Sequence, residues 1–318
     1  MALSKIMKIR NDSMKFTMRL LWGVLLSFML SFQALAQTDN DGSDEAAINK
    51  MNAYVGLMNR AIRASDSLER YDSWVDMKKG PTGKERVIYG LYAPYDVREE
   101  IAAAKEAIAS DPKMPTLDAA MQHFIETYEN LAPVLDKASK YYDRSDYKSD
   151  KMQGGKDFHV KIAEYAPLFG EARKEADRLL TEEKKVMDQA LLDAIEKSEG
   201  KKALWHVRNV MIKAQSVVDI LPDADKPVID MQKFDTVLKD YAGAVRQMDD
   251  YASEHPNSFH VFESSPGSLL SKLRDFQEKL QKTKGDARKG GGDDLQWIVQ
   301  EYNMMVTTSE SATEFAND

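Results

Sequence analysis

The residues best suited to chemistry lie in one short stretch, residues 141–159. It holds four aspartates and a histidine: Asp143, Asp146, Asp150, Asp157 and His159. Carboxylate oxygens are the ligands that hard divalent cations prefer, and histidine adds a nitrogen ligand. The spacing does not match an EF-hand, because no run of alternating aspartates ends in a glutamate. The stretch therefore predicts either a metal- or small-ligand-binding loop or a structural loop whose acids cap the next helix, and we favour the structural loop.

A second candidate site is a set of tyrosines in two connections. The first connection holds Tyr89, Tyr92 and Tyr95, and the second holds Tyr141, Tyr142 and Tyr147. If the two connections meet at one end of a helical bundle, the rings would form an amphipathic surface suited to a protein or glycan partner. Tyrosine also commonly bridges a core and water, so we favour ordinary packing at the end of the bundle.

Common catalytic and cofactor motifs are missing from the sequence. None of the five histidines stands in His-Glu-x-x-His, and none follows a glutamate by three residues. A Gly-x-Ser-x-Gly elbow and a phosphate-binding loop are also missing. With no cysteine, disulfides, thiolate metal sites and cysteine nucleophiles are excluded. We therefore expect no cofactor, and a hydrolase that uses paired carboxylates is the least favoured activity.

The elements that must position these residues are helices. Apolar residues recur at three- and four-residue steps, the period of a helix that buries one face. The pattern predicts helices over residues 46–75, 96–109, 117–142, 158–179, 186–195, 204–221, 231–252, 268–280 and 295–306. Pro133 and Pro167 fall inside two of them and predict bends, which either open a pocket or only curve the bundle. Gly200 is either the end of a helix or a weak point within one.

No stretch alternates apolar and polar residues over a useful length, as a half-buried strand would. The predicted fold class is therefore all-α: an elongated bundle of roughly seven or eight helices, long, antiparallel and heptad-patterned.

Residues 1–36 have the pattern of a secretory signal peptide. A basic segment precedes an apolar run over residues 20–32, and Ala34-Leu35-Ala36 fits the small-x-small cleavage rule. We favour cleavage after Ala36 over a retained anchor, because the run is shorter than the roughly 20 residues that a membrane span needs. Residues 37–45 would then form a disordered acidic leader, residues 46–307 a single all-helical domain, and residues 308–318 a flexible tail.

The charge and the cysteine count narrow the choice of partners. The formal net charge is −8, and removal of the signal segment leaves 39 basic and 51 acidic residues, a net charge of −12. Such a surface repels phosphate backbones, so we expect no nucleic-acid partner. No later segment is apolar enough to span a membrane, and without cysteine the chain is not a lipoprotein. We expect an exported protein of the periplasm or cell envelope.

The stretch over residues 141–159 also carries a family resemblance. Paired tyrosines, Tyr141-Tyr142, precede Asp146-Tyr147-Lys148-Ser149-Asp150, and Gly155-Lys156 and His159 open the next helix. This order resembles the YiiG-like bacterial envelope family, domain of unknown function 3829, as does the opening over residues 50–59. The resemblance implies an all-helical, exported bacterial protein. It supplies no catalytic residues, and it includes lipoproteins, which this chain without cysteine does not match.

Together these observations predict an exported cell-envelope helical bundle that acts as a non-enzymatic binding or structural module, with an envelope protein or a glycan as its partner. The alternative is a metal- or small-ligand-binding protein that uses the loop from Tyr141 to His159.

Overall fold

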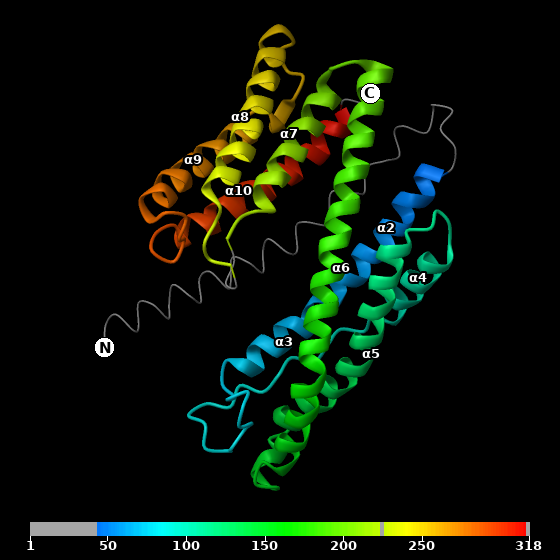
Figure 1. Cartoon of the computed structure of the whole chain (residues 1–318), viewed down its shortest axis with the longest axis vertical. Helices are drawn as coiled ribbons and strands as arrows, with labels where there is room; N and C mark the ends of the chain where they lie inside the picture. Colours follow the sequence, from blue (N-terminus) through cyan, green and yellow to red (C-terminus); the bar gives the residue numbers. More distant parts are fainter. Residues whose placement is uncertain (1–42, 223–225, 316–318) are drawn as a thin grey trace. The chain divides into compact units, whose positions relative to one another are not determined.

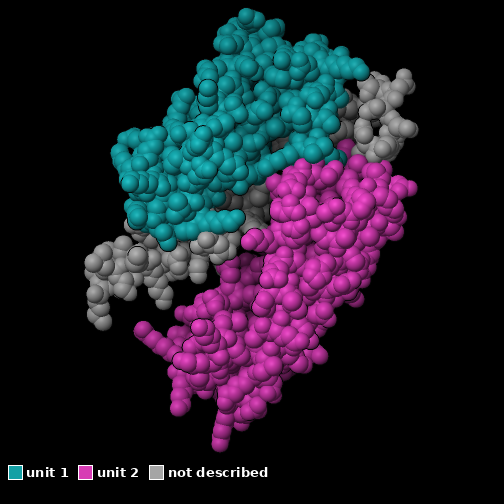
Figure 2. Space-filling view, in the orientation of Figure 1, with its two compact units in different colours: residues 1–37, 185–318 teal, residues 38–184 magenta. Residues whose placement is uncertain are grey.

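The structure is a computed structural model that describes residues 43–222 and 226–315. It confirms the all-α fold class: the only β feature in these ranges is an isolated bridge between Val228 and Asp286. The chain divides into two compact units, unit 2 (residues 38–184) and unit 1 (residues 185–318 with 1–37), which Figure 2 shows in different colours. The predicted signal segment and most of the leader lie outside the described residues. The single domain over residues 46–307 stays a prediction, since one helix belongs to both units.

Unit 2 is built from helices that pack along one another (Figure 1). Its elements are α2 (Ser43–Arg60), α3 (Ile62–Asp72), α4 (Arg98–Ala109), α5 (Pro115–Asp143), η2 (Asp146–Lys148) and the first part of α6 (Gln153–Glu199). α2 packs against α4, and α4 packs against α5. α5 and α6 share a buried aromatic contact, in which the Phe124 and Phe169 ring centroids are 5.6 Å apart. The seams that the sequence predicted are therefore the buried faces of this unit.

Three features of α2, α3 and α6 differ from the prediction. The predicted helix over residues 46–75 is two helices, because the chain tightens at buried Ala61, whose carbonyl accepts from Ala64 at 3.0 Å. α2 also begins at Ser43, inside the predicted leader. The predicted helices over residues 158–179 and 186–195 are one helix, α6, which continues past Pro167. Gly200, at φ +80°, ends α6, and this settles its role as a helix terminator.

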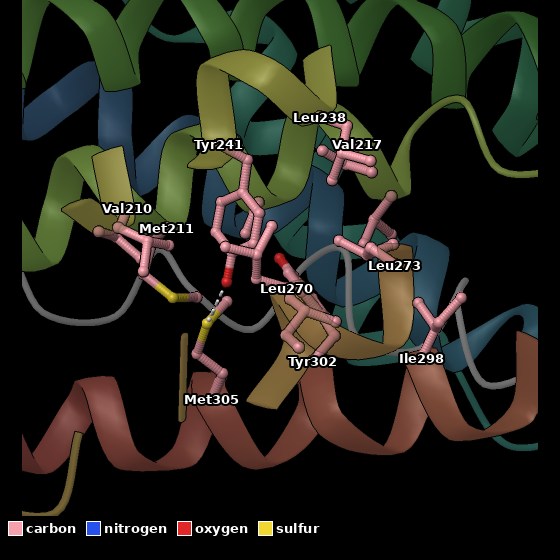
Figure 3. Close-up of a cluster of buried hydrophobic side chains, with 14 of the residues drawn as sticks. Val210, Met211, Val217, Leu238, Tyr241, Leu270, Leu273, Ile298, Tyr302 and Met305 are labelled. Carbon is pink, nitrogen blue, oxygen red and sulfur yellow. Dashed lines mark hydrogen bonds between the residues drawn. The ribbon is translucent and has the colours of Figure 1, made fainter. Parts of the chain in front are cut away.

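Unit 1 is a second helical bundle with its own core. It holds the end of α6, α7 (Ala203–Val218), α8 (Met231–Glu254), η3 (His260–Phe262), α9 (Ser265–Thr283) and α10 (Gly292–Phe315). Figure 3 shows apolar side chains of α7, α8, α9 and α10 converging on one cluster. The buried Tyr241 hydroxyl donates to the Pro266 carbonyl at 2.8 Å and lies 3.5 Å from the Met305 sulfur. Phenol groups in this core are thus paired, as burial requires.

The last helix is longer than predicted. The sequence placed its end near residue 306 and a flexible tail from residue 308, whereas α10 continues to Phe315. Ser309 and Ala312 are buried, and the Thr308 hydroxyl donates to the Ser265 hydroxyl at 3.1 Å. Packing against the start of α9 therefore extends the helix through a polar sequence. Within the described ranges, no helix is both long enough and apolar enough to cross a membrane.

Candidate functional site

The structure does not bring together the candidate ligands of the predicted metal-binding loop, which are Asp146, Asp150, Asp157 and His159. Asp146 forms an ion pair with Arg144 at 2.8 Å, and Asp157 accepts from the Gln153 side chain at 2.9 Å. In the part of the chain that the structure describes, no group of three or more histidine, aspartate and glutamate side chains is arranged to hold a metal ion. Asp146, Asp150 and Asp157 each have a local partner, so the structure gives the metal alternative no support.

Asp150 has the structural role that the sequence favoured for this loop. Its carboxylate accepts from the Tyr141 hydroxyl at 2.8 Å and from the Gly154 N–H at 2.9 Å. Desolvation acts to raise the pKa of Asp150, but the hydrogen bonds from Gly154 and Tyr141 outweigh it and lower that pKa. Since Gly154 lies in the first turn of α6, Asp150 satisfies an amide that the helix itself leaves unpaired.

The tyrosines of the second connection belong to the core and not to an outer surface. Tyr141 and Tyr142 are buried, with ring centroids 5.0 Å apart in an edge-to-face contact, and Tyr147 is half-buried against both. Burial raises the pKa of Tyr141 to about 12. For this half of the set the packing alternative is the one that the geometry supports, because buried rings cannot meet a partner.

His159 fastens the first connection to the beginning of α6. Its Nδ1 lies 3.1 Å from the Tyr71 hydroxyl, and the ring is 9 % exposed. Gly80, at φ +76°, lies so close that a Cβ there would be 2.7 Å from the His159 ring. Burial lowers the pKa of His159, and a hydrogen bond to the Met77 carbonyl offsets part of this effect. The lowered pKa favours the neutral imidazole, which can accept from the Tyr71 hydroxyl through Nδ1.

Because of this lowered pKa, we expect the folded state to lose stability as the pH falls below about 6.5, the value for an unperturbed histidine. Below that pH the unfolded chain binds a proton that the folded chain resists, so the contribution of His159 is complete above it and is lost on acidification. Urea unfolding of the wild type and of His159→Gln at pH 7.5 and pH 5.5 checks this. The decrease in unfolding free energy from pH 7.5 to pH 5.5 is expected to be smaller in His159→Gln than in the wild type. Groups common to both proteins, such as His206 and Asp177, cancel in the comparison, and equal losses would contradict the assignment.

The first connection contains the most exposed part of the predicted tyrosine site. We call residues 84–97 the strap. Side chains of α2, of α3 and of the turn after α3 hold it by its backbone carbonyls. The Ser67 hydroxyl donates to the Tyr92 carbonyl at 2.8 Å, and Trp74 Nε1 donates to the Gly90 carbonyl at 3.0 Å. Two further carbonyls of the strap accept from Arg70 and Arg60, so four carbonyls are used in this way. The strap is therefore fixed to the helices without being part of a helix or sheet.

Arginines and tyrosines alternate along the strap and form what we call the ladder. Its tyrosines, three residues apart, are Tyr89, Tyr92 and Tyr95, and its arginines are Arg60, Arg63 and Arg70. Measured from the guanidinium carbon to ring centroids, Arg70 lies 6.0 Å from Tyr89 and 4.4 Å from Tyr92. Arg63 lies 3.8 Å from Tyr92 and 5.5 Å from Tyr95. Such distances are those of cation–π contacts.

The ends of the ladder are also hydrogen-bonded. Arg70 donates from Nε and Nη2 to the Tyr89 carbonyl at 2.8 and 2.6 Å. Arg60 lies 4.8 Å from the Tyr95 ring and donates to the Asp96 carbonyl at 3.4 Å. Tyr89 is 51 % exposed and Tyr95 47 % exposed, so each ring is held on one side and open to solvent on the other. This arrangement presents aromatic side chains that lose little freedom on binding.

Comparison with known proteins places the chain in a family. A family model described as "Protein of unknown function (DUF3829)" matches residues 45–315. The chain belongs to the DUF3829 family. It is 25 % identical over 281 residues to "Uncharacterized protein YiiG" of Escherichia coli (strain K12), a match that covers 83 % of this chain and 79 % of that protein. No solved structure matches the chain. The expected family resemblance is thus confirmed.

The DUF3829 match spans the strap and the described part of both units, but neither description names an activity. The site is therefore argued from geometry. In this DUF3829 protein the sequence indicated the tyrosines and missed the arginines. The sequence signal for them is the spacing of Arg60, Arg63 and Arg70 on α2 and α3. This spacing matches the row of tyrosines only when the strap is known to pack against these helices.

We expect Arg70→Ala to loosen the strap. The change removes two hydrogen bonds to the Tyr89 carbonyl and contacts with two rings, which together stabilise the strap locally by about 1–2 kcal/mol. Limited trypsin cleavage after Lys84 and Arg86 should accelerate roughly five- to thirtyfold, because cleavage follows the population of the opened strap. Arg178→Ala, which removes an exposed arginine paired with Glu175 and Glu182, is the control. Equal cleavage in the Arg70 variant and the wild type would show that the ladder does not hold the strap.

Proposed function

We propose that this DUF3829 protein is an exported, non-enzymatic binding protein of the bacterial cell envelope and that the strap is its binding surface. The observation that carries the proposal is the ladder, which holds Tyr89 and Tyr95 half-exposed at fixed positions on unit 2. Tyrosine and arginine are the residue types that most often dominate the energy of protein interfaces. A row of both, already ordered by hydrogen bonds to the backbone, is suited to binding.

The envelope location is supported by the sequence alone. The basic segment, the apolar run and the small-x-small site over residues 1–36 are typical of a secretory signal peptide. The export step would leave a chain that begins at Gln37. Its surplus of acidic residues makes the segment over residues 77–98, with five basic and two acidic residues, a local exception.

Site-specific photo-cross-linking in the host cell tests the proposal. A photoreactive phenylalanine is placed at Tyr89 or Tyr95, and, as a matched control, at Val160 of α6, which is 66 % exposed in the same unit. We expect a discrete light-dependent adduct from both strap positions and none from Val160. The adduct should lie in the osmotic-shock fraction, on a chain shortened at Ala36.

Several outcomes would decide against the proposal. Adducts of equal yield from Val160 would show that the strap is not a preferred surface, and a full-length chain confined to the cytoplasm would contradict export. Arg63→Ala, which removes the middle of the ladder, should abolish the adduct from Tyr95 while leaving the amount of protein unchanged. Mass spectrometry of the adduct separates a protein partner from a glycan.

A further inference from the structure

The strap and the residues beside it carry a charge opposite to that of the whole chain. Residues 77–98 hold five basic and two acidic residues. Both acids are engaged: Glu85 accepts from the Thr82 hydroxyl at 2.8 Å, and Asp96 pairs with Arg98 at 2.6 Å. The basic side chains of this segment that remain exposed and form no ion pair with another described residue are Lys78, Lys84 and Arg86. The solvent-facing side of the segment is therefore positive.

The backbone of the strap is only partly hydrogen-bonded. Its carbonyls at Tyr89, Gly90, Tyr92 and Asp96 accept from side chains of α2, of α3 and of the turn after α3. In contrast, none of the backbone N–H groups over residues 86–93 donates to another described protein group. The amides over residues 86–93, and the carbonyls of that range that accept no side chain, thus have no partner among the described residues. The exposed lysine and arginine side chains add positively charged donors, which favour an anionic partner.

From this pairing of free amides with free positive charge we propose that the strap binds an acidic polypeptide segment in an extended conformation. The inference rests on the proposed function and names the class of partner. Carboxylates are negative and act only as acceptors, so they complement the exposed lysine and arginine side chains. An extended chain also presents backbone carbonyls and amides at a repeat of about 6.6–6.8 Å on one side, so it can pair with unpaired backbone groups of the strap. Main-chain pairing of this kind gives affinity, and the side chains beside it give specificity.

The two half-exposed tyrosines of the ladder add aromatic groups to this charged surface. Tyr89 and Tyr95 are half-exposed, and Val87, two residues before Tyr89, is exposed as well, so apolar side chains that alternate with the acids of the partner have apolar groups to pack against. The preferred ligand is therefore a segment in which acidic and apolar residues alternate. A glycan supplies both donors and acceptors and has no regular row of carbonyls, so it fits the run of amides less well.

Binding is measured with the mature chain and a short fluorescein-labelled peptide of alternating aspartate and valine. Lys84→Glu combined with Arg86→Glu should weaken binding by about tenfold or more, because buried or partly buried charge pairs across interfaces contribute at this scale. The matched control reverses two exposed lysines of α6 in the same unit, Lys161→Glu with Lys174→Glu, and should change the affinity by less than about twofold. A peptide of alternating lysine and valine should not bind.

Amide exchange provides a measurement that a purely electrostatic contact would not change. On addition of the acidic peptide, the N–H groups over residues 86–93 should exchange more slowly, whereas a purely electrostatic contact would leave them unchanged. Equal weakening in both charge-reversed proteins, equal binding of the basic peptide, or binding of phosphatidylglycerol vesicles in place of the peptide would overturn the inference. If the acidic peptide fails while the strap still gives its adduct in cells, only the partner class is wrong. If the adduct fails too, the proposed function is wrong.

Discussion

Replacing Asp118 with alanine should destabilise unit 2 by about 3–5 kcal/mol, because it leaves the ammonium group of Lys50 buried without a counter-charge. The Lys50 side chain is 1 % exposed, and its Nζ lies 3.0 Å from Asp118 Oδ1. The same carboxylate accepts from the Tyr54 hydroxyl at 2.5 Å and from the Met114 N–H at 3.0 Å. Lys50 also donates to the carbonyls of Ser110 and Pro112, so one ion pair fastens α2, α5 and the turn between α4 and α5.

Urea unfolding followed by circular dichroism, together with amide exchange of α2 and α4, measures this effect. Asp136→Ala is the matched control, since Asp136 pairs with Lys140 on the exposed side of the same helix and should change stability by at most about 0.5 kcal/mol. If the two variants unfold at the same urea concentration, the buried pair does not hold the unit together. The double variant Lys50→Met with Asp118→Leu should recover part of the loss, because it removes both charges at once.

The fold class could be predicted from the sequence because an apolar residue at every third or fourth position identifies a helix. The pattern stays recognisable even where single positions depart from it. The helix over residues 117–142 was predicted within a few residues of α5. The continuity of α6 was not, because Glu183 interrupts the apolar seam. Glutamate favours helix, however, so a break in the seam is not a break in the backbone. The end at Gly200 depends on a left-handed backbone conformation, for which the sequence offered only a permissive residue.

The candidate site was predicted less completely, for a physical reason. Acidic residues in a row satisfy the composition of a cation site, but local partners such as Arg144 and the Gly154 amide compete for each carboxylate. Which partner wins depends on backbone geometry that the sequence does not display. The ladder likewise joins residues from two helices to an extended strap, and the buried pair of Lys50 with Asp118 joins residues 68 positions apart. The period and spacing of residues describe one helix or loop at a time, so they could not predict contacts between elements.

Gly285→Ala is expected to destabilise unit 1 by about 2–4 kcal/mol, since the backbone here excludes a side chain for two reasons. Gly285 has φ +83°, and a Cβ would lie 2.4 Å from the Ile229 carbonyl oxygen, an overlap that only a backbone shift relieves. Such a shift would disturb the bond from the Ile229 N–H to the Gly285 carbonyl, 3.0 Å long, which ties the segment before α8 to the end of α9. Residues 285–292 contain four glycines, and at Gly285 the Cβ would meet backbone and not a side chain that can move.

Gly170→Ala provides a control of opposite sign. Gly170 lies on the exposed side of α6, and a Cβ built there meets no atom within 4 Å. Alanine should therefore stabilise the helix by about 0.5–1 kcal/mol, the usual difference between these residues in a helix interior. Thermal unfolding of both variants compares the two positions in one protein. A higher melting temperature in both variants would mean that the loop at residue 285 adapts to a side chain, and that the bond between Ile229 and Gly285 does not fix the joint between α8 and α9.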